Sequence, residues 1–182
     1  MNIKMLNENE KFKGKTFTLF ERDFELRHET KVTWEIIKKK NSVAVVPIDS
    51  DGNIYMLNQF FAAVNDWGLT LPKGSIEDGE SSIEAAAKEL NEETGLEGDL
   101  TELITVSVSP GYLTQLTTIF IAKNLKPAKK RLKCDENEII EVIKMPFKEA
   151  LSKIIKGNIV EARTVAGLLL ANEELNNNGI SK

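Results

Sequence analysis

One helix with well-marked ends stands in the middle of this chain, among shorter segments that have the pattern of strands. The residues Ser-Ser-Ile-Glu at positions 81–84 form a capping box, in which Ser81 accepts a backbone N–H and Glu84 reaches back. Gly95 stands where a left-handed C-terminal cap is expected. These signals predict a helix over Ser82–Thr94. Its apolar stripe, which we expect to face the core, consists of Ile83, Ala86, Ala87 and Leu90.

Strand-like segments, rich in β-branched and aromatic residues, lie on both sides of this helix. Two more helices are expected, over residues 147–155 and 162–175. Strands with a few helices interposed predict an α+β sandwich with a mixed sheet. We expect residues 1–40 to form a separate region of antiparallel strands and residues 41–182 to form the main domain. The expected strands cover residues 16–20, 24–27, 32–38, 43–48, 54–60, 103–108, 117–122 and 139–144.

The composition is unfavourable for several functions. The net charge is −4 and no basic stripe is visible, whereas a general nucleic-acid binder needs a basic surface. The longest apolar runs are far too short to span a membrane, and the opening of the chain lacks the apolar stretch of a signal peptide. The single cysteine, Cys134, forms no internal disulfide, which fits a reducing cytoplasm. The single histidine, His28, rules out a His-rich zinc site within one chain, so we expect carboxylates to do any chemistry.

Three glutamates crowd the end of the predicted helix. Glu89, Glu92 and Glu93 are three and four residues apart, so their carboxylates lie on one side, where like charges destabilise a helix. The negative end of the helix dipole adds to this cost, and locally only Lys88, which can pair with Glu84 or Glu92, offsets it. A bound divalent cation would reverse the effect, and Mg²⁺ prefers such oxygen ligands. The alternative is an ordinary solvated acidic face.

The segment before the helix, residues 71–80, favours the metal interpretation. Its glycines permit a tight loop that folds back over the start of the helix. Such a loop can direct backbone carbonyls at an ion that the helix carboxylates hold.

Together, these residues resemble the Nudix box, G-x5-E-x7-R-E-U-x-E-E-x-G-U, in which U is aliphatic. Lys88 stands where the family has an arginine that partners box carboxylates, and lysine keeps the charge but lacks the planar fork. The resemblance implies a Nudix-type α/β/α sandwich with a mixed sheet, preceded by N-terminal antiparallel strands. The other fixed positions of the box are matched by Gly74, Glu80, Glu89, Leu90, Glu92, Glu93, Gly95 and Leu96.

Further segments are similar to one branch of the family, the ADP-ribose pyrophosphatases and nucleotide-sugar hydrolases. Residues 43–48 and 56–60 resemble the strand pair before the box in that branch. Residues 109–111 (Ser-Pro-Gly) resemble the segment that follows the box, and residues 157–164 resemble the signature before the last helix.

Three positions depart from the pattern of the ADP-ribose enzymes. Phe61 and Thr70 stand where those enzymes often carry arginine and glutamate. The sequence Leu-Pro-Lys-Gly at 71–74 replaces Leu-Pro-Ala-Gly, and it is also seen in relatives that act on other ADP or GDP compounds.

The resemblance implies a metal site on the helix. Glu89 and Glu93 would ligate Mg²⁺, with Mn²⁺ as the alternative ion, and Glu92 would be a further ligand or a support for one. The backbone carbonyl of Lys73 would complete the site, and Glu80 would support the loop by ion pairing. Structural roles are implied for Gly74, Glu80, Lys88 and Gly95.

The general base is expected in a loop after the box. Residues 135–138 (Asp-Glu-Asn-Glu) are similar to the acidic Glu-x-Glu segment of relatives. Glu136 is therefore the candidate base and Glu138 a further metal ligand, while Glu92 or Glu93 is the next candidate for the base. A solvated acidic loop is the alternative interpretation.

Substrate contacts are expected outside the box. Trp34 and Tyr112 are candidates to stack on the nucleobase, although an aromatic residue on a strand more often packs against its neighbours. Arg22 and Arg27 could hold phosphates, but an ordinary surface position is the more common role for such arginines. The relatives are homodimers whose N-terminal strands exchange, so the resemblance implies that residues 1–40 form a dimerisation and substrate arm.

In sum, the resemblance implies a hydrolase of the pyrophosphate bond in ADP-ribose or a nucleotide sugar, which yields a nucleoside monophosphate and a sugar phosphate. A dinucleotide such as NADH or diadenosine polyphosphate is the alternative substrate. A different alternative is a non-catalytic module that binds ADP-ribose, but a sensor has no need of Glu89, Glu92 and Glu93. The expected partners are a small nucleotide and a second copy of the chain, and neither nucleic acid nor a membrane is expected.

Overall fold

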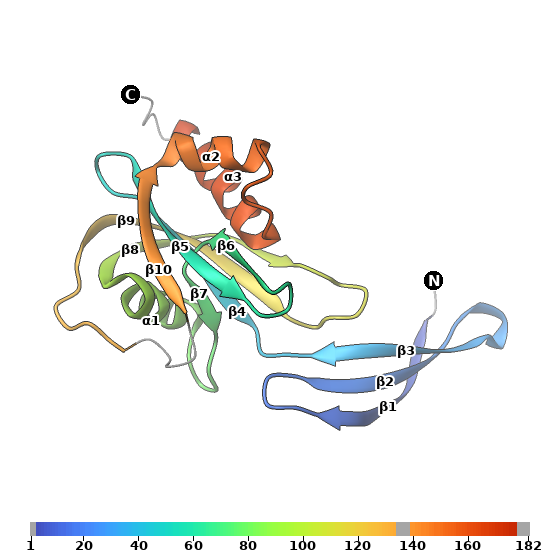
Figure 1. Cartoon of the computed structure of the whole chain (residues 1–182). Coiled ribbons are helices and arrows are strands. Elements are labelled where there is room, and N and C mark those ends of the chain that lie inside the picture. Colours follow the sequence, from blue (N-terminus) through green and yellow to red (C-terminus); the bar gives the residue numbers. More distant parts are fainter. Residues whose placement is uncertain (1–2, 134–138, 178–182) are drawn as a thin grey trace. The chain divides into compact units, whose positions relative to one another are not determined.

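The structure, a computed structural model, describes residues 3–133 and 139–177. The chain divides into two compact units (Figure 1). The first contains residues 1–41 and 107–116, and the second contains residues 42–106 and 117–182. Among the helices in the described part of the chain, none is long and apolar enough to cross a membrane.

The first unit is built on an antiparallel sheet with the strand order β1-β2-β3. β1 (Lys4–Lys13) pairs with β2 (Thr18–Glu25), and β2 pairs with β3 (Lys31–Lys38). A short 3-10 helix, Arg27–Glu29, connects β2 and β3.

A segment distant in the sequence lies along the edge of β3. The backbone N–H of Ile37 donates to the carbonyl of Tyr112 at 2.6 Å, and the N–H of Thr114 donates to the carbonyl of Ile37 at 3.0 Å. These bonds explain why residues 107–116 belong to the first unit although they follow the Nudix-like segment in the sequence.

At the centre of the second unit is a mixed sheet with the strand order β7-β4-β9-β8. β4 (Ser42–Pro47) runs parallel to β9 (Leu116–Pro127) and antiparallel to β7 (Lys73–Ser75), while β8 (Leu96–Ser107) lies beyond β9. A second sheet has the order β10-β5-β6. Its strands are β5 (Asn53–Phe61), β6 (Asp66–Thr70) and β10 (Ile140–Pro146).

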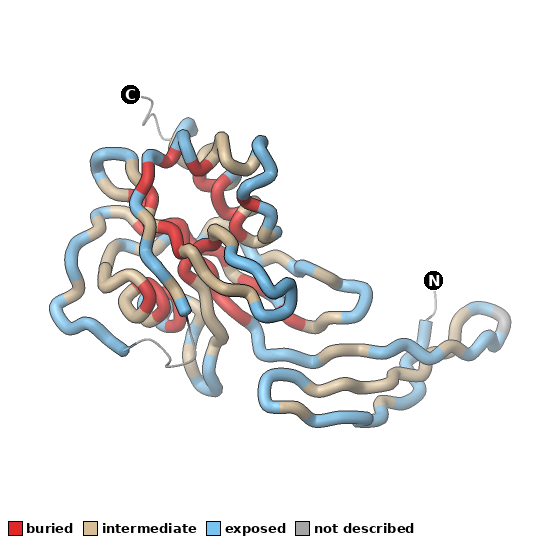
Figure 2. Tube along the Cα trace, viewed as in Figure 1, coloured by how far each residue is buried: buried red, intermediate tan, exposed pale blue. Residues whose placement is uncertain are grey.

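Helices cover both faces of the mixed sheet. Because neighbouring residues on a strand point to opposite faces, β4 and β9 each contribute to two hydrophobic cores, and β4 is buried along its whole length (Figure 2). On one face, Val43, Val45 and Phe120 pack with helix α1 (Ser82–Thr94). On the other face, α2 (Phe147–Ile155), α3 (Ala162–Asn177) and the second sheet join the core. Its members on β4 and β9 are Ala44, Val46, Ile119 and Ile121.

Most predicted elements lie within observed ones, and the first two predicted helices have the predicted bounds. The two predicted segments at 16–20 and 24–27 belong largely to one strand, β2. Strand β1 was not predicted. Its apolar residues, Met5, Leu6 and Phe12, do not alternate regularly with polar ones, so the pattern that identifies a strand is missing. Nine of its ten residues are exposed.

Candidate metal and active site

Helix α1 buries a face that includes two carboxylates. Its ends are as predicted, because the capping box of Ser81 and Glu84 is present and Gly95 has a φ of 72°. The predicted apolar stripe is partly wrong, since Ile83 is 49 % exposed and Ala87 is exposed as well. The buried residues of the helix are Ala85, Ala86, Glu89, Leu90 and Glu93.

The loop before the helix contacts both buried carboxylates. The backbone N–H of Lys73 donates to Oε2 of Glu93 at 2.8 Å. Glu93 is 1 % exposed, and its Oε1 is buried and accepts no hydrogen bond within the described chain. A Cβ added at Gly74 would lie 2.1 Å from Oε1 of Glu89, so a larger residue here would displace the Glu89 carboxylate or the loop.

Lys88, which replaces the arginine of the box, forms ion pairs with Glu80 and Glu89, and Glu92, one of its two predicted partners, also interacts with its charge. Its ammonium lies 3.6 Å from Glu80 and 3.7 Å from Glu89, whereas Glu84 is used in the capping box. Burial alone would lower the pKa of Lys88, but the charges of Glu89, Glu80 and Glu92 outweigh it and raise that pKa. Lys88 therefore keeps its charge and links the loop residue Glu80 to the site residue Glu89.

Glu80 also closes the loop directly. Its Oε2 accepts a hydrogen bond from the backbone N–H of Glu77 at 2.9 Å, and the N–H of Glu80 donates to the carbonyl of Glu77 at 3.0 Å. Between them, Gly79 has a φ of 85°, a conformation that L-residues with a side chain rarely adopt. The loop is thus held in a single turn next to the start of α1.

A buried network ties the other end of this loop to helix α3. The hydroxyl of Thr164 accepts from the backbone N–H of Leu71 at 3.1 Å and lies 3.2 Å from the hydroxyl of Thr70. Glu161 accepts from the N–H and the hydroxyl of Thr164 at 2.9 and 2.8 Å. Burial alone would raise the pKa of Glu161, but Arg163 and these hydrogen bonds lower it below its ordinary value.

Residues 157–164 resemble a family signature, but no role was predicted for Glu161 or Thr164. The signal that could have identified them is a capping pattern, with a carboxylate just before α3 and a hydroxyl three residues later. Thr164 accepts a hydrogen bond from Leu71, and Glu161 accepts hydrogen bonds from Thr164, so the pair positions the strand end from which the site loop departs.

Asn91 was also missed. Its amide Nδ2 donates to the carbonyl of Lys130 at 3.0 Å, and its Oδ1 accepts from the N–H of Leu132 at 2.9 Å. The N–H of Ala128 donates to the carbonyl of Gly95 at 2.9 Å. A basic segment is therefore fastened to the C-terminal end of α1, where positive charge is favourable.

Other predicted site residues lie elsewhere. Glu136 and Glu138 lie outside the described residues. Trp34, Arg27 and Tyr112 belong to the first unit. Trp34 packs against Phe24 with ring centroids 5.0 Å apart, which agrees with the packing interpretation. As substrate contacts, all three stay predictions.

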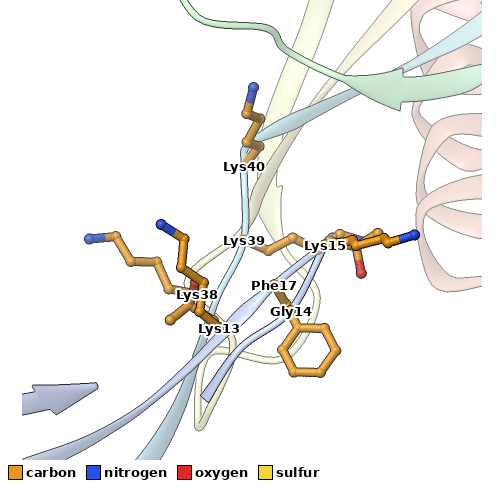
Figure 3. Close-up of a pocket in the computed structure, with 9 residues that line it drawn as sticks. Lys13, Gly14, Lys15, Phe17, Lys38, Lys39 and Lys40 are labelled. Carbon is orange, nitrogen blue, oxygen red and sulfur yellow. The ribbon is translucent and has the colours of Figure 1, made fainter. Parts of the chain in front are cut away.

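The first unit contains a lysine-lined hollow of about 360 Å³ (Figure 3). The side chains of Lys13 and Lys38 point to one side of it and those of Lys15 and Lys39 to the other. Because these ammonium groups diverge, the hollow is not arranged around a single small anion.

Within residues 3–133 and 139–177, no group of three or more His, Cys, Asp or Glu side chains is arranged to hold a metal ion. The described part of the site is a pair of buried carboxylates, Glu89 and Glu93, together with the backbone of Lys73 and the half-buried Glu92.

The second unit has an α+β fold, in which a mixed sheet lies between helices. Its candidate site is an acidic one, where a glycine loop contacts the glutamates at the end of α1. The family model described as NUDIX domain matches residues 38–168, and the chain belongs to the Nudix family. The predicted family is thereby confirmed. A crystal structure described as an ADP compounds hydrolase matches with a TM-score of 0.87 at 28 % identity, covering 98 % of this chain and 97 % of that one. This match confirms the α+β fold with a mixed sheet.

Two curated relatives are similar over most of their length. The ADP-ribose pyrophosphatase of Bacillus subtilis (strain 168) is 30 % identical over 162 residues, which cover 88 % of each chain. The ADP compounds hydrolase NudE of Escherichia coli (strain K12) is 30 % identical over 178 residues, covering 96 % of this chain and 94 % of the relative.

Proposed function

We propose that this protein hydrolyses the pyrophosphate bond of ADP-ribose or a nucleotide sugar, yielding a nucleoside monophosphate and a sugar phosphate. The observation that carries the proposal is the burial of Glu89 and Glu93 under the loop at Lys73 and Gly74. Burying charged carboxylates is unfavourable unless other charges or dipoles compensate them. The names of the relatives, an ADP-ribose pyrophosphatase and an ADP compounds hydrolase, support this substrate class.

The donor set fits a hard divalent cation. Glu89 and Glu93 offer carboxylate oxygens, Lys73 adds its backbone carbonyl, and Mg²⁺ or Mn²⁺ prefers such ligands. When bound there, the cation supplies positive charge next to the phosphates and activates the attacking water. The chain's own contribution is to keep the two carboxylates in place, through the Lys73 N–H, the Lys88 ion pair and the close approach of Gly74.

The general base belongs to this proposal as well. Glu136 is the first candidate and Glu138 is proposed as a further ligand, both from the similarity of residues 135–138 to relatives. Glu92, half-buried on α1, and Glu93 are the next candidates for the base.

We further propose a homodimer that works in the cytoplasm. The single cysteine fits a reducing compartment. The first unit supports the dimer, since an antiparallel sheet needs a second layer against its apolar side chains. Met5, Phe12 and Trp34 are each about half exposed there. In the dimer, residues 1–40 would serve as the dimerisation and substrate arm.

The experiment is a substrate panel. The protein is incubated with Mg²⁺ and ADP-ribose, nucleotide sugars, NADH and diadenosine polyphosphates, and the products are identified by mass. The proposal expects AMP and ribose 5-phosphate from ADP-ribose, or the equivalent pair from a nucleotide sugar. Cleavage of only the dinucleotides would favour the alternative substrate, and binding of ADP-ribose without cleavage would favour the non-catalytic module.

A further inference from the structure

The side chain of Lys73 is held on the opposite side of the site loop from the helix carboxylates. In the pairing of β4 with β7, Lys73 lies opposite Ala44 and Gly74 lies opposite Val43. Val43 belongs to the core under α1, whereas Ala44 belongs to the core on the other face. Lys73 therefore projects toward the second sheet, while the next residue, Gly74, faces Glu89.

Two side chains of β5 hold the Lys73 ammonium. It donates a short hydrogen bond to Oε1 of Gln59, and it lies 5.3 Å from the centre of the Phe61 ring. Phe61 is itself held against the backbone of β6, because a Cβ at Gly68 would lie 3.0 Å from the ring. The amide oxygen and the ring face both attract a cation, so the ammonium has a defined position.

Lys73 thus connects a negative group, the Glu93 carboxylate, with a positive one, its own ammonium. The Lys73 backbone N–H contacts the carboxylate of Glu93, and its ammonium contacts Gln59 of β5. An anionic group at this strand edge would be attracted by the ammonium, and a cation held by Glu89 and Glu93 would add further positive charge to the site. Several positive groups are a recurrent arrangement around phosphoryl groups.

We propose that the ammonium of Lys73 binds a phosphate of the substrate and is a substrate-binding residue of this site. The inference rests on the proposed function, because it takes the ligand to be a nucleoside diphosphate derivative. An ammonium acts as a point charge with rotatable donors, which suits it to a phosphate oxygen at either position of the diphosphate. Gln59 and Phe61 are positioning residues for it.

The first test is equilibrium binding in excess chelator, so that it does not depend on activity. Titration calorimetry compares ADP-ribose, AMP and adenosine as ligands of the parent and of Lys73→Met. We expect the variant to bind ADP-ribose roughly tenfold more weakly, the size of one lost hydrogen bond to a charged group. Its affinity for adenosine, which has no phosphate, should not change.

The second test is a kinetic split with Mg²⁺ present. Lys73→Met should raise KM roughly tenfold with little change in kcat, because the contact exists already in the bound substrate. Lys73→Arg keeps the charge and should retain more affinity than the methionine variant. Gln59→Leu removes one support and should lie between parent and Lys73→Met.

The matched control is Lys153→Met on α2. Its ammonium is paired with Glu149 at 3.3 Å and its side chain is 30 % exposed. This variant should bind and cleave like the parent. Equal losses for ADP-ribose and adenosine, or an unchanged Kd and KM in Lys73→Met, would overturn the inference and leave the proposed function standing. If the parent neither binds nor cleaves any diphosphate derivative, both this inference and the proposed function are wrong.

Discussion

Helix α1 carries glutamates at both ends, and the two ends hold them in different ways. At its start, Glu84 is exposed and accepts hydrogen bonds from the hydroxyl and the backbone N–H of Ser81, which lower the pKa of Glu84. At its end, Glu89 and Glu93 are buried where the helix dipole is unfavourable. Glu93 there accepts a hydrogen bond from Lys73, twenty residues earlier in the chain.

This comparison shows that Glu84 stabilises the helix, whereas the burial of Glu89 and Glu93 has no explanation in helix stability. Glu84 is fully accounted for by a local cap. Glu89 and Glu93 repel each other at a spacing of four residues, and they occupy a face that apolar side chains could have filled. We therefore expect a change at the end of α1 to lower activity without lowering stability, and a change at its start to lower stability without changing activity.

The largest effect is expected at Glu93. Glu93→Gln keeps the shape and removes one negative charge, so kcat should fall by roughly 10³-fold if the charge holds an essential cation. In chelator, the melting temperature of the variant should equal or exceed that of the parent, because repulsion with Glu89 is removed. Steady-state kinetics and thermal unfolding measure both quantities. A variant that keeps more than about a tenth of parental activity would contradict the metal site.

A smaller loss is expected when the loop is pushed away from Glu89. Gly74→Ala places a Cβ 2.1 Å from a carboxylate oxygen, so Glu89 or the loop must move. A displacement of about 1 Å in an active site lowers kcat by roughly 10²-fold. Gly111→Ala is the control, because a Cβ there meets no atom within 4 Å. Parental kinetics in Gly74→Ala would mean that the approach of the loop is not needed.

Metal binding at the end of α1 should also raise the melting temperature of the protein. With Mg²⁺ at about 100 times its Kd, the melting temperature of the parent should rise by roughly 5–10 °C, since the ion binds only the folded site. Scanning fluorimetry with Mg²⁺ and with chelator measures the shift. Glu93→Gln should lose most of it. An equal shift in both proteins would place the ion elsewhere.

The smallest effect is expected at the start of the helix. Glu84→Gln should lower the melting temperature slightly at pH 7 and leave kcat unchanged. The pKa of Glu84 is lower in the folded protein than the ordinary value of 4.5, so its contribution is present above that pH. It is lost as the pH falls through the folded pKa. The melting temperatures of the parent and of Glu84→Gln should therefore differ at neutral pH and become equal at acidic pH. A loss of activity in this variant would contradict the expected difference between the two ends of the helix.

Local signals predicted α1 well. Ser81, Glu84 and Gly95 act within one helical turn of each end, and the helix has the bounds that they predict. The box glutamates were found in the same way, since their spacing is a property of the helix. The positions of Trp34, Arg27 and Tyr112 relative to a substrate, and the identity of the base, are still predictions.

Contacts between distant segments were not predicted. Thr164 holds Leu71 from a helix that begins about ninety residues later in the chain, and no local pattern indicates this partner. Strand β1 escaped prediction because its exposed residues show no alternation, so its pairing with β2 is what makes it a strand.

The sequence by itself determined where α1 begins and ends and which residue types stand along it, because caps and helical spacing depend on near neighbours only. The sequence also placed Ala86 and Leu90 on the buried side of α1, but the tertiary structure decided which other residues are buried with them. Hydrophobicity predicted Ile83 and Ala87 inside, yet Glu89 and Glu93 are inside instead. The reason is that the loop at Lys73 and Gly74, held by β4 and α3, supplies the backbone contact and the space for these carboxylates, and a helix alone has neither.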